Sequence, residues 1–299
     1  MVVIESSYGY EGPLDLWETL RYALPQDRLL LRSVEGRVTF TQWTATGPAT
    51  VSIEVADELV VTAHGTGAET AMGEVPRLLG LDDDPAGFDP GDGPLREMHR
   101  RSMGLRLGSS GRVFDTILPA VLGQRVTTGE AKRSLGRLVR AYGQPAPGHD
   151  DLRLPPTPER IAAISPERLR ELGIERSRAR VVSEVARRAV RLEEIMSMTR
   201  NDAERRLLAV PGIGPWTAAL VMGAAWGDRD AVPVGDYHLP NTVAWALANE
   251  PRATDERMLE LLDPFRPQRR RAVLLIKQQG GHAPRYGPRS PLSVISRDS

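Results

Sequence analysis

The tetrapeptide Pro-Gly-Ile-Gly at 211–214, inside LLAVPGIGPWTAALVMGAAW, constrains the fold of this chain more than any other feature. It predicts a short helix, a tight turn, and a second helix that starts at Pro215 with small and apolar residues on one face. Gly212 and Gly214 can adopt dihedrals closed to other residues, and they leave the backbone open to a bulky anion. Their amides precede a helix, where free N–H groups and the helix dipole favour phosphate. The segment predicts a helix-hairpin-helix that binds a DNA backbone without reading bases, although such glycines can also be purely structural.

The composition narrows the chemistry that the chain can perform. Its 299 residues include no cysteine, which excludes thiolate zinc sites, cysteine-ligated iron–sulfur clusters, disulfide scaffolds and cysteine nucleophiles. Basic and acidic residues number 39 each, so a large, uniformly basic DNA-binding face is not expected. This balance does not exclude a small, local DNA-binding site. Only Lys132 and Lys277 are lysines, so a mechanism that needs an amine has two candidates.

The amino terminus lacks the basic and long apolar regions of a secretory signal. The longest apolar stretch, at 218–226, is far shorter than the roughly 18 residues of a membrane span. We therefore expect a cytoplasmic, nucleoid-associated protein with no membrane partner.

The first ninety residues predict an α+β domain. Apolar and polar residues alternate at 48–56, and the segments 36–44 and 58–65 resemble that pattern, with turn residues between them. Helices are expected at about 14–23 and 69–79. We expect an antiparallel sheet with helices on one face.

From about residue 112 onward the pattern changes to capped helices. We expect helices at 127–142, where Thr127 and Glu130 form a capping box, at 175–196, at 202–209 with Asn201 as the cap, and from Pro267 to Gly280. The predicted domains are 1–90 for the sheet, 112–230 for a helical domain with the hairpin, 91–111 with 231–285 for a second helical domain, and 286–299 for a flexible tail.

About twenty residues beyond the hairpin, AVPVGDYHLPN at 231–241 places Asp236 before another helix. In the superfamily of helix-hairpin-helix DNA glycosylases, an aspartate at that spacing is the catalytic signature. With the stretches 104–139 and 156–180, the chain resembles the DNA-3-methyladenine glycosylase II branch from about residue 103 to 279. The resemblance implies a TATA-binding-protein-like α+β domain followed by two all-α domains, with an active-site cleft between the helical pair.

The resemblance implies that Asp236 is the catalytic residue. A carboxylate near C1′ of a flipped nucleotide stabilises the positive charge that builds on the sugar as the base leaves. An aspartate before a helix is also an ordinary N-cap, and the two roles are compatible. Trp216 stands where bifunctional members carry a lysine, and neither Lys132 nor Lys277 lies near the motif. We therefore expect a monomeric, monofunctional enzyme that removes alkylated purines from duplex DNA by hydrolysis.

Two alternatives to that function stay open. One is a related glycosylase for oxidised, deaminated or mismatched bases. The other is a non-catalytic protein that binds lesions in DNA on the same scaffold.

The resemblance extends to DNA and base contacts. Gln124 and Arg125 match the loop that fills the gap left by the flipped nucleotide, where an apolar wedge is more usual. The hairpin residues expected to bind DNA are Gly212, Ile213, Gly214 and Thr217.

Three residues are expected to line the base pocket. Trp216 could stack on an alkylated base or could pack in the core. Leu220 and Gln268 stand where some members of the branch have further aromatic residues, which leaves the substrate range open.

No cofactor is expected to be required. In the resembled family, backbone carbonyls of the hairpin hold a monovalent cation, Na⁺ or K⁺, and the matching residues here are Leu208, Val210 and Ile213. The arginines at 269–271, with Arg96, Arg100 and Arg101, either contact phosphates or form solvated faces.

Overall fold

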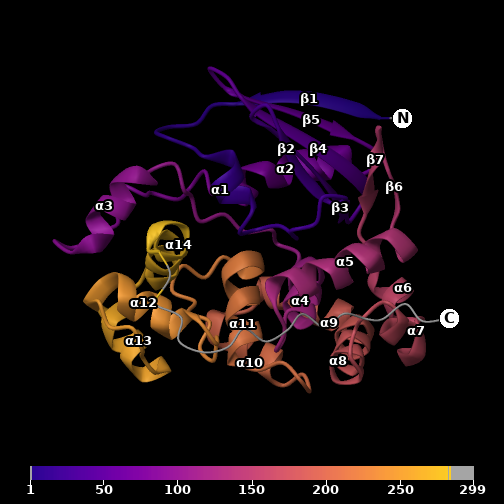
Figure 1. The fold of residues 1–299 in the computed structure, drawn as a ribbon. Helices are drawn as coiled ribbons and strands as arrows, with labels where there is room; N and C mark the ends of the chain where they lie inside the picture. Colours follow the sequence, from indigo (N-terminus) through magenta and orange to yellow (C-terminus); the bar gives the residue numbers. More distant parts are fainter. Residues whose placement is uncertain (1, 282, 284–299) are drawn as a thin grey trace.

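The computed structural model describes residues 2–281 and residue 283, so the tail predicted for 286–299 lies outside the described residues. Its amino-terminal part is an antiparallel sheet of order β1-β5-β4-β3-β2, next to two helices (Figure 1). The elements are β1 (Val3–Tyr8), α1 (Leu16–Leu20), β2 (Leu31–Val34), β3 (Arg37–Thr44), β4 (Gly47–Val55), β5 (Leu59–His64) and α2 (Ala68–Leu78). The predicted α+β class and antiparallel sheet are confirmed.

The sequence prediction omitted β1 and β2, the two edge strands. Both are largely exposed or half-buried along their length, so they carry little of the apolar alternation that marks a strand. The helix expected at 14–23 is also shorter, since α1 covers only Leu16–Leu20 with the Asp15 side chain as its cap.

The central strands are buried on both faces, whereas the sequence predicted one exposed face. Thr39 and Ser52, opposite one another on β3 and β4, share a hydrogen bond of 2.9 Å between buried hydroxyls. The Thr41 hydroxyl donates to the carbonyl of Arg153 at 2.6 Å. Arg153 belongs to a small hairpin of β6 (Gln144–Ala146) and β7 (His149–Leu154), which the sequence did not predict and which packs on β3.

Helices make up most of the rest of the chain, and all of them except α3, which lies at the left beside α1, are drawn below the sheet in Figure 1. They are α3 (Pro94–Arg101), α4 (Val113–Leu122), α5 (Thr128–Tyr142), α6 (Pro158–Ala162), α7 (Pro166–Glu171), α8 (Arg176–Arg187), α9 (Ala189–Glu193), α10 (Arg200–Leu208), α11 (Pro215–Val221), α12 (Leu239–Ala248), α13 (Asp255–Leu262) and α14 (Arg269–Gln279). Short 3₁₀ turns cover Glu194–Ser197 and Asp263–Phe265, and a π-helical turn, η2, covers Met222–Trp226.

Three helix predictions need correction. The helix expected at 175–196 breaks after Arg187 into α8 and α9, which lets the Glu193 carboxylate reach the start of α4. The helix expected from 202 starts at Arg200, and Thr199 rather than Asn201 caps it. The final helix starts at Arg269, two residues after Pro267, whose preceding peptide bond is cis.

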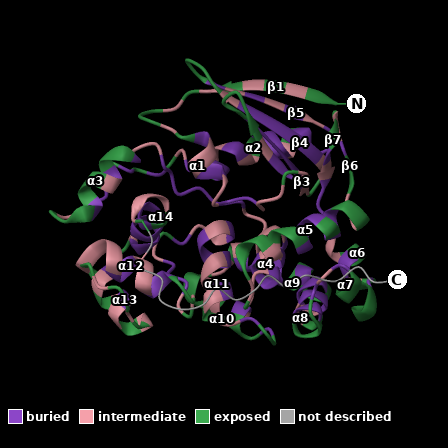
Figure 2. Cartoon of the chain, viewed as in Figure 1, coloured by how far each residue is buried: buried purple, intermediate pink, exposed green. Residues whose placement is uncertain are grey.

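The buried apolar side chains form three clusters. Figure 2 marks the buried residues along the backbone in purple. One lies between the sheet and helices α1 and α2, and another joins α4 to α11. The third combines α12, α13 and α14 with Phe88, Leu95, Leu105 and Leu107 from the segment that follows the sheet. That segment therefore packs with helices that come more than a hundred residues later in the chain. No helix within the described residues has both the length and the apolar character that a membrane span requires.

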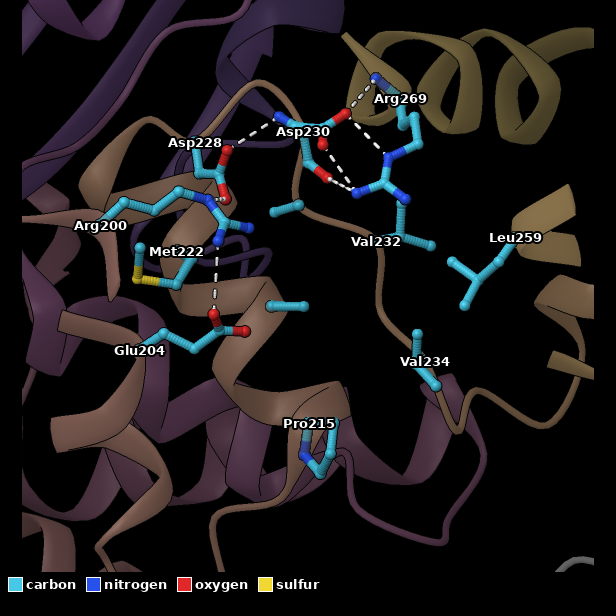
Figure 3. A pocket seen from close by; sticks show the side chains of 12 residues that line it. Arg200, Glu204, Pro215, Met222, Asp228, Asp230, Val232, Val234, Leu259 and Arg269 are labelled. Carbon is cyan, nitrogen blue, oxygen red and sulfur yellow. Dashed lines mark hydrogen bonds and ion pairs between the residues drawn. The ribbon is translucent and has the colours of Figure 1, made fainter. Parts of the chain in front are cut away.

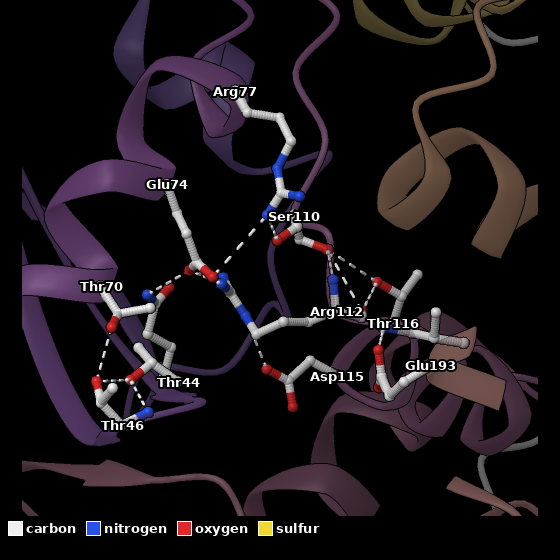
Figure 4. Close-up of polar contacts among 12 residues, drawn as sticks. Thr44, Thr46, Thr70, Glu74, Arg77, Ser110, Arg112, Asp115, Thr116 and Glu193 are labelled. Atoms are coloured by element: carbon white, nitrogen blue, oxygen red, sulfur yellow. Dashed lines mark hydrogen bonds and ion pairs between the residues drawn. The ribbon is translucent and has the colours of Figure 1, made fainter. Parts of the chain in front are cut away.

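Ion pairs join α2, the helix next to the sheet, to the start of α4 (Figure 4). Arg112, just before α4, pairs with Glu74 of α2 at 2.6 Å and with Asp115 at 3.2 Å. The Glu193 carboxylate accepts hydrogen bonds from the backbone N–H groups of Val113 and Phe114 at 2.9 and 2.8 Å. Burial nonetheless raises the pKa of Glu193 above its ordinary value. These contacts orient α4 relative to both α2 and α9.

A fully buried ion pair joins the segment after the sheet to the last helix. Arg271 of α14 donates to both carboxylate oxygens of Asp83, at 2.6 Å to Oδ1, and the two side chains are 1% and 0% exposed. Asp83 also accepts from the N–H of Leu107 at 2.9 Å, and Arg271 donates to the carbonyl of Leu105 at 3.1 Å. The pair therefore attaches three segments that are distant in the sequence.

We expect Arg271→Met to lower the free energy of unfolding by about 3–5 kcal/mol, because the buried Asp83 carboxylate loses its two-pronged partner and keeps only the more distant Arg229 Nε, at 3.7 Å from Oδ1. The double variant Arg271→Met with Asp83→Asn should recover much of that loss, since a neutral amide can still accept from Leu107. Urea denaturation measures both. Equal losses in the single and double variants would contradict this account.

Candidate active site

The predicted hairpin joins α10 to α11, but its two glycines differ. Gly212 has φ +90, and a Cβ there would lie 2.3 Å from a methyl carbon of Val181, so no other residue fits. Gly214 is extended, with φ −102, and a Cβ there would meet nothing within 4 Å. The expectation that both glycines adopt dihedrals closed to other residues is therefore wrong for Gly214, where the glycine leaves an open approach to the backbone.

The amides of the turn are not equally available. The N–H of Ile213 donates to the carbonyl of Val210 at 3.0 Å, and the Ile213 side chain is buried. The described residues supply no hydrogen-bond acceptor for the N–H groups of Gly212 and Gly214. These two amides, with those of Trp216 and Thr217 in the first turn of α11, are free to bind an anion.

Asp236 lies in the loop before α12, and three donors hold its carboxylate. Oδ1 accepts from the backbone N–H groups of His238 and Leu239, each at 2.9 Å, and so caps α12. Oδ2 accepts from the indole Nε1–H of Trp216 at 2.9 Å. The capping role is present, and the side chain remains partly exposed.

Trp216 connects the hairpin, Asp236 and the loop between α4 and α5. Besides its bond to Asp236, its ring edge lies 3.5 Å from the position of a Cβ on Gly123. The ring is only half-buried. A residue that bonds the candidate catalytic carboxylate and remains partly open to solvent fits a pocket wall better than a core position.

The loop between α4 and α5 is bonded to the hairpin. Gln124 Nε2 donates to the carbonyl of Gly212 at 2.9 Å and to the hydroxyl of Thr217 at 3.0 Å. Thr217 is 1% exposed, so its hydroxyl can influence DNA only through Gln124. Arg125 is exposed with φ +56, a left-handed conformation that non-glycine residues rarely adopt.

The bonds of the Asp236 carboxylate include none to the remaining predicted residues. The Gln268 side chain accepts from Arg271 Nε at 2.9 Å, and Leu220 is half-buried one turn beyond Trp216 on α11. Leu208 ends α10, where carbonyls lack helical partners, while the carbonyl of Val210 already accepts from Ile213. Within the described residues, no group of three or more His, Asp or Glu side chains is arranged to hold a metal ion.

Lys277 corrects the statement that neither lysine lies near the motif. It is the first exposed residue after the buried part of α14, yet surrounding protein lowers the pKa of its amine. The charge of Asp236 opposes that shift and the charge of Arg21 adds to it, so both groups lie within electrostatic range.

The arginines at 269–271 were expected either to contact phosphates or to form a solvated face. Neither is the case, because all three side chains are buried. Arg269 pairs with Asp230 at 2.7 Å and Arg271 pairs with Asp83, while Arg270 lies against Gly223. The exposed arginines of α3 are paired as well: Arg96 with Asp92, and Arg100 and Arg101 with Glu97. Periodicity cannot predict a buried run of charges, since each partner comes from another part of the chain.

A recess of about 240 Å³ lies behind the segment that leads to Asp236 (Figure 3). Its lining includes Pro215 and Ala219 of α11 and Met222 of η2, whereas Trp216 and Leu220 lie on a different face of α11. Its polar groups already bond one another, as in Arg200 with Asp228 at 2.8 Å. The recess is therefore not the base pocket predicted around Trp216.

Comparison with known proteins gives a family match. The family described as HhH-GPD superfamily base excision DNA repair protein matches residues 118–267. "Probable bifunctional transcriptional activator/DNA repair enzyme AlkA" of Mycobacterium tuberculosis is 34% identical over 184 residues, which cover 57% of this chain and 35% of that protein. The chain thus spans about a third of that relative. "DNA-3-methyladenine glycosylase 2" of Escherichia coli is 28% identical over 221 residues, covering 73% of this chain and 74% of that protein.

Solved structures share the fold. The "3-methyladenine dna-glycosylase from Archaeoglobus fulgidus" has a TM-score of 0.76 at 23% identity, covering 92% of this chain and 96% of that one. The 8-oxoguanine glycosylase/lyase of Clostridium acetobutylicum, in complex with double-stranded DNA, has a TM-score of 0.71 at 16% identity, covering 88% and 90%. With a family match over half of its length, the chain belongs to the HhH-GPD superfamily of base excision DNA repair proteins, and its relatives include the DNA-3-methyladenine glycosylases.

Proposed function

We propose that this protein is a monofunctional DNA glycosylase that hydrolyses the glycosidic bond of damaged purines of the 3-methyladenine type in duplex DNA. The observation that carries the proposal is the Asp236 carboxylate, held by Trp216 of the hairpin helix and by the first amides of α12. Family membership and the names of the relatives support the same activity.

In this mechanism Asp236 faces C1′ of a nucleotide that has rotated out of the duplex. Its charge stabilises the sugar as the bond to the base breaks, and it orients the water that attacks C1′. Three donors prevent the carboxylate from turning away, so little reorganisation accompanies the reaction. Trp216 takes the position of the lysine of bifunctional members, which leaves hydrolysis as the reaction.

The hairpin binds the DNA backbone in this proposal. The N–H groups of Gly212 and Gly214 approach a phosphate, and Gln124 holds the loop that carries Arg125 against the hairpin. The exposed, left-handed Arg125 enters the gap in the duplex, where its planar guanidinium stacks on bases. A monovalent cation on the carbonyls of Leu208, Val210 and Ile213 would strengthen phosphate binding at the same turn.

We also propose that the protein is a monomer, because its three apolar clusters are formed by residues of one chain. Its site of action in this proposal is the nucleoid, where its duplex substrate lies. Sedimentation of the protein with and without duplex DNA tests the oligomeric state.

Asp236→Asn should reduce single-turnover base release by about 10²–10³-fold, because the charge opposite the sugar is lost. The asparagine oxygen can still cap α12, so binding to undamaged duplex should stay within about threefold of wild type. The measurement is release from duplexes that carry 7-methylguanine, 3-methyladenine, 1,N6-ethenoadenine, hypoxanthine or 8-oxoguanine, followed by alkaline cleavage.

Each alternative function has its own outcome in that assay. Binding without release of any base by the wild type would favour a non-catalytic lesion-binding protein. Equal release by both proteins would remove Asp236 from the mechanism, and strand cleavage before alkali would contradict simple hydrolysis.

Gly214→Ala should weaken binding to duplex DNA by about tenfold, equivalent to 1.4 kcal/mol, because the added methyl group stands between the open amide and a phosphate. The free protein should lose less than about 0.5 kcal/mol of stability, since that methyl group meets nothing. Gly212→Ala is the contrasting control, which should destabilise the fold because of its left-handed φ and the contact with Val181. Unchanged affinity in Gly214→Ala would exclude this contact.

Trp216→Phe should slow base release about tenfold, because a hydrogen bond to a charged group contributes about 1.5–3 kcal/mol. The aromatic ring is kept, so DNA binding should not change. Trp226→Phe is a matched control that removes another indole bond, one that goes to the carbonyl of Ile195 at 3.1 Å and not to Asp236. Equal effects of the two substitutions would indicate a loss of packing rather than of carboxylate orientation.

A further inference from the structure

The stretch 232–235, which leads into Asp236, has little support from the protein behind it. The recess of about 240 Å³ lies on that side, between Val232 and Val234 of the stretch, α11, and Leu259 of α13 (Figure 3). Because the surrounding side chains leave this space open, packing alone does not fix the position of the stretch. The position of the Asp236 carboxylate therefore depends on hydrogen bonds.

One side chain from another element bonds this stretch. Asp255 is the first residue of α13, and its Oδ2 accepts from the backbone N–H of Gly235 at 3.1 Å. The N–H of Val234 donates to the carbonyl of Val232, within the same stretch. Among the described residues, no other hydrogen bond joins the stretch to another element. Asp255 thus attaches the peptide before the candidate catalytic residue to a helix.

Gly235 is the point at which the chain turns toward Asp236. Its φ of +88 lies in the left-handed region that favours glycine, and a Cβ there would meet nothing within 4 Å. A glycine without close neighbours rotates readily about its backbone bonds, and such a rotation would displace Asp236. The bond to Asp255 limits this freedom before Asp236, and the bonds to His238 and Leu239 limit it after Asp236.

The stability of α13 does not account for Asp255. An acid in the first turn of a helix is favoured by the helix dipole, but Glu256 supplies a second acid in that turn and Thr254 caps it. Oδ1 of Asp255 is buried and has no hydrogen-bond partner within the described residues, which costs stability. A role in the site explains this carboxylate better than a role in the helix.

We propose that Asp255 is a positioning residue, which holds the Gly235 peptide so that Asp236 keeps its place opposite C1′ of the flipped nucleotide. This inference rests on the proposed glycosylase activity and adds a residue of α13 to it. Asp255 does not touch the substrate and acts through Gly235, so that the Asp236 carboxylate needs no rearrangement before the reaction. Without this bond the stretch can move toward the recess and carry Asp236 away from the sugar.

Asp255→Ala should slow single-turnover release of 7-methylguanine from a duplex about tenfold, because Asp236 then spends less time in the reactive position. Binding to undamaged duplex should stay within about twofold of wild type, since the hairpin is unchanged. Asp255→Asn should keep release within about threefold of wild type, because an amide oxygen can still accept from Gly235. Hydrogen exchange at the Gly235 amide, followed by NMR, should be fast in Asp255→Ala and slow in wild type and in Asp255→Asn.

Asn241→Ala is the matched control for a loss of stability. The Asn241 side chain accepts from the N–H of Ala253 at 2.9 Å, so it ties α12 to the segment before α13 without bonding Gly235. This variant should be less stable than wild type, yet it should release 7-methylguanine within about twofold of the wild-type rate. Glu256→Ala, which removes the other acid of the first turn of α13, should also stay within about twofold.

Equal losses of release in Asp255→Ala and Asp255→Asn would show that the charge matters rather than the hydrogen bond, and would overturn the inference. Equal losses in Asp255→Ala and Asn241→Ala would trace the effect to stability and overturn it as well. Fast exchange of the Gly235 amide in wild type would overturn it without any variant. Release of no base by wild type would instead overturn the proposed glycosylase activity, and amide exchange alone would then decide whether Asp255 holds Gly235.

Discussion

The buried ion pair between Arg271 and Asp83 is the contact on which the arrangement of the molecule depends. It attaches the segment after the sheet to the last helix, and through Leu105 and Leu107 it orders the stretch that leads into α4. An ion pair with no access to water adds little net stability, but it disfavours other arrangements of the chain, because each partner alone would be an unpaired buried charge. The fold therefore has one way to bring α14 back to the segment that begins the helical part.

The same helix then supplies residues to three different environments. Arg269 meets Asp230, Arg270 covers Gly223, and Arg271 meets Asp83. Successive residues on a helix point about 100° apart, so one short run reaches the recess behind Asp236, the π-helical turn η2 and the buried segment after the sheet. The position of α14 thereby links three parts of the chain that are distant in the sequence.

Local signals in the sequence predicted the hairpin, the cap at Thr127 and the placement of Asp236 before α12, because each depends on residues within a few positions. The edge strands β1 and β2 escaped prediction because they bury little apolar surface. The start of α10 lies two residues before the predicted one because Thr199 and Asn201 are both good caps, and in the structure it is the Thr199 hydroxyl that accepts from the N–H of Asp202. The burial of Arg271 depends on a partner 188 positions away, which no local pattern contains.

The pairing of the surface arginines has a consequence for how the protein finds its target. On α3, Arg96, Arg100 and Arg101 are neutralised by Asp92 and Glu97, so they have little attraction left for a polyanion. These three side chains therefore release few counterions from a polyanion and add little ionic-strength dependence to its binding. Exposed arginines that have no such partner in the described part of the chain, Arg125 among them, are the ones left to attract a phosphate backbone from a distance.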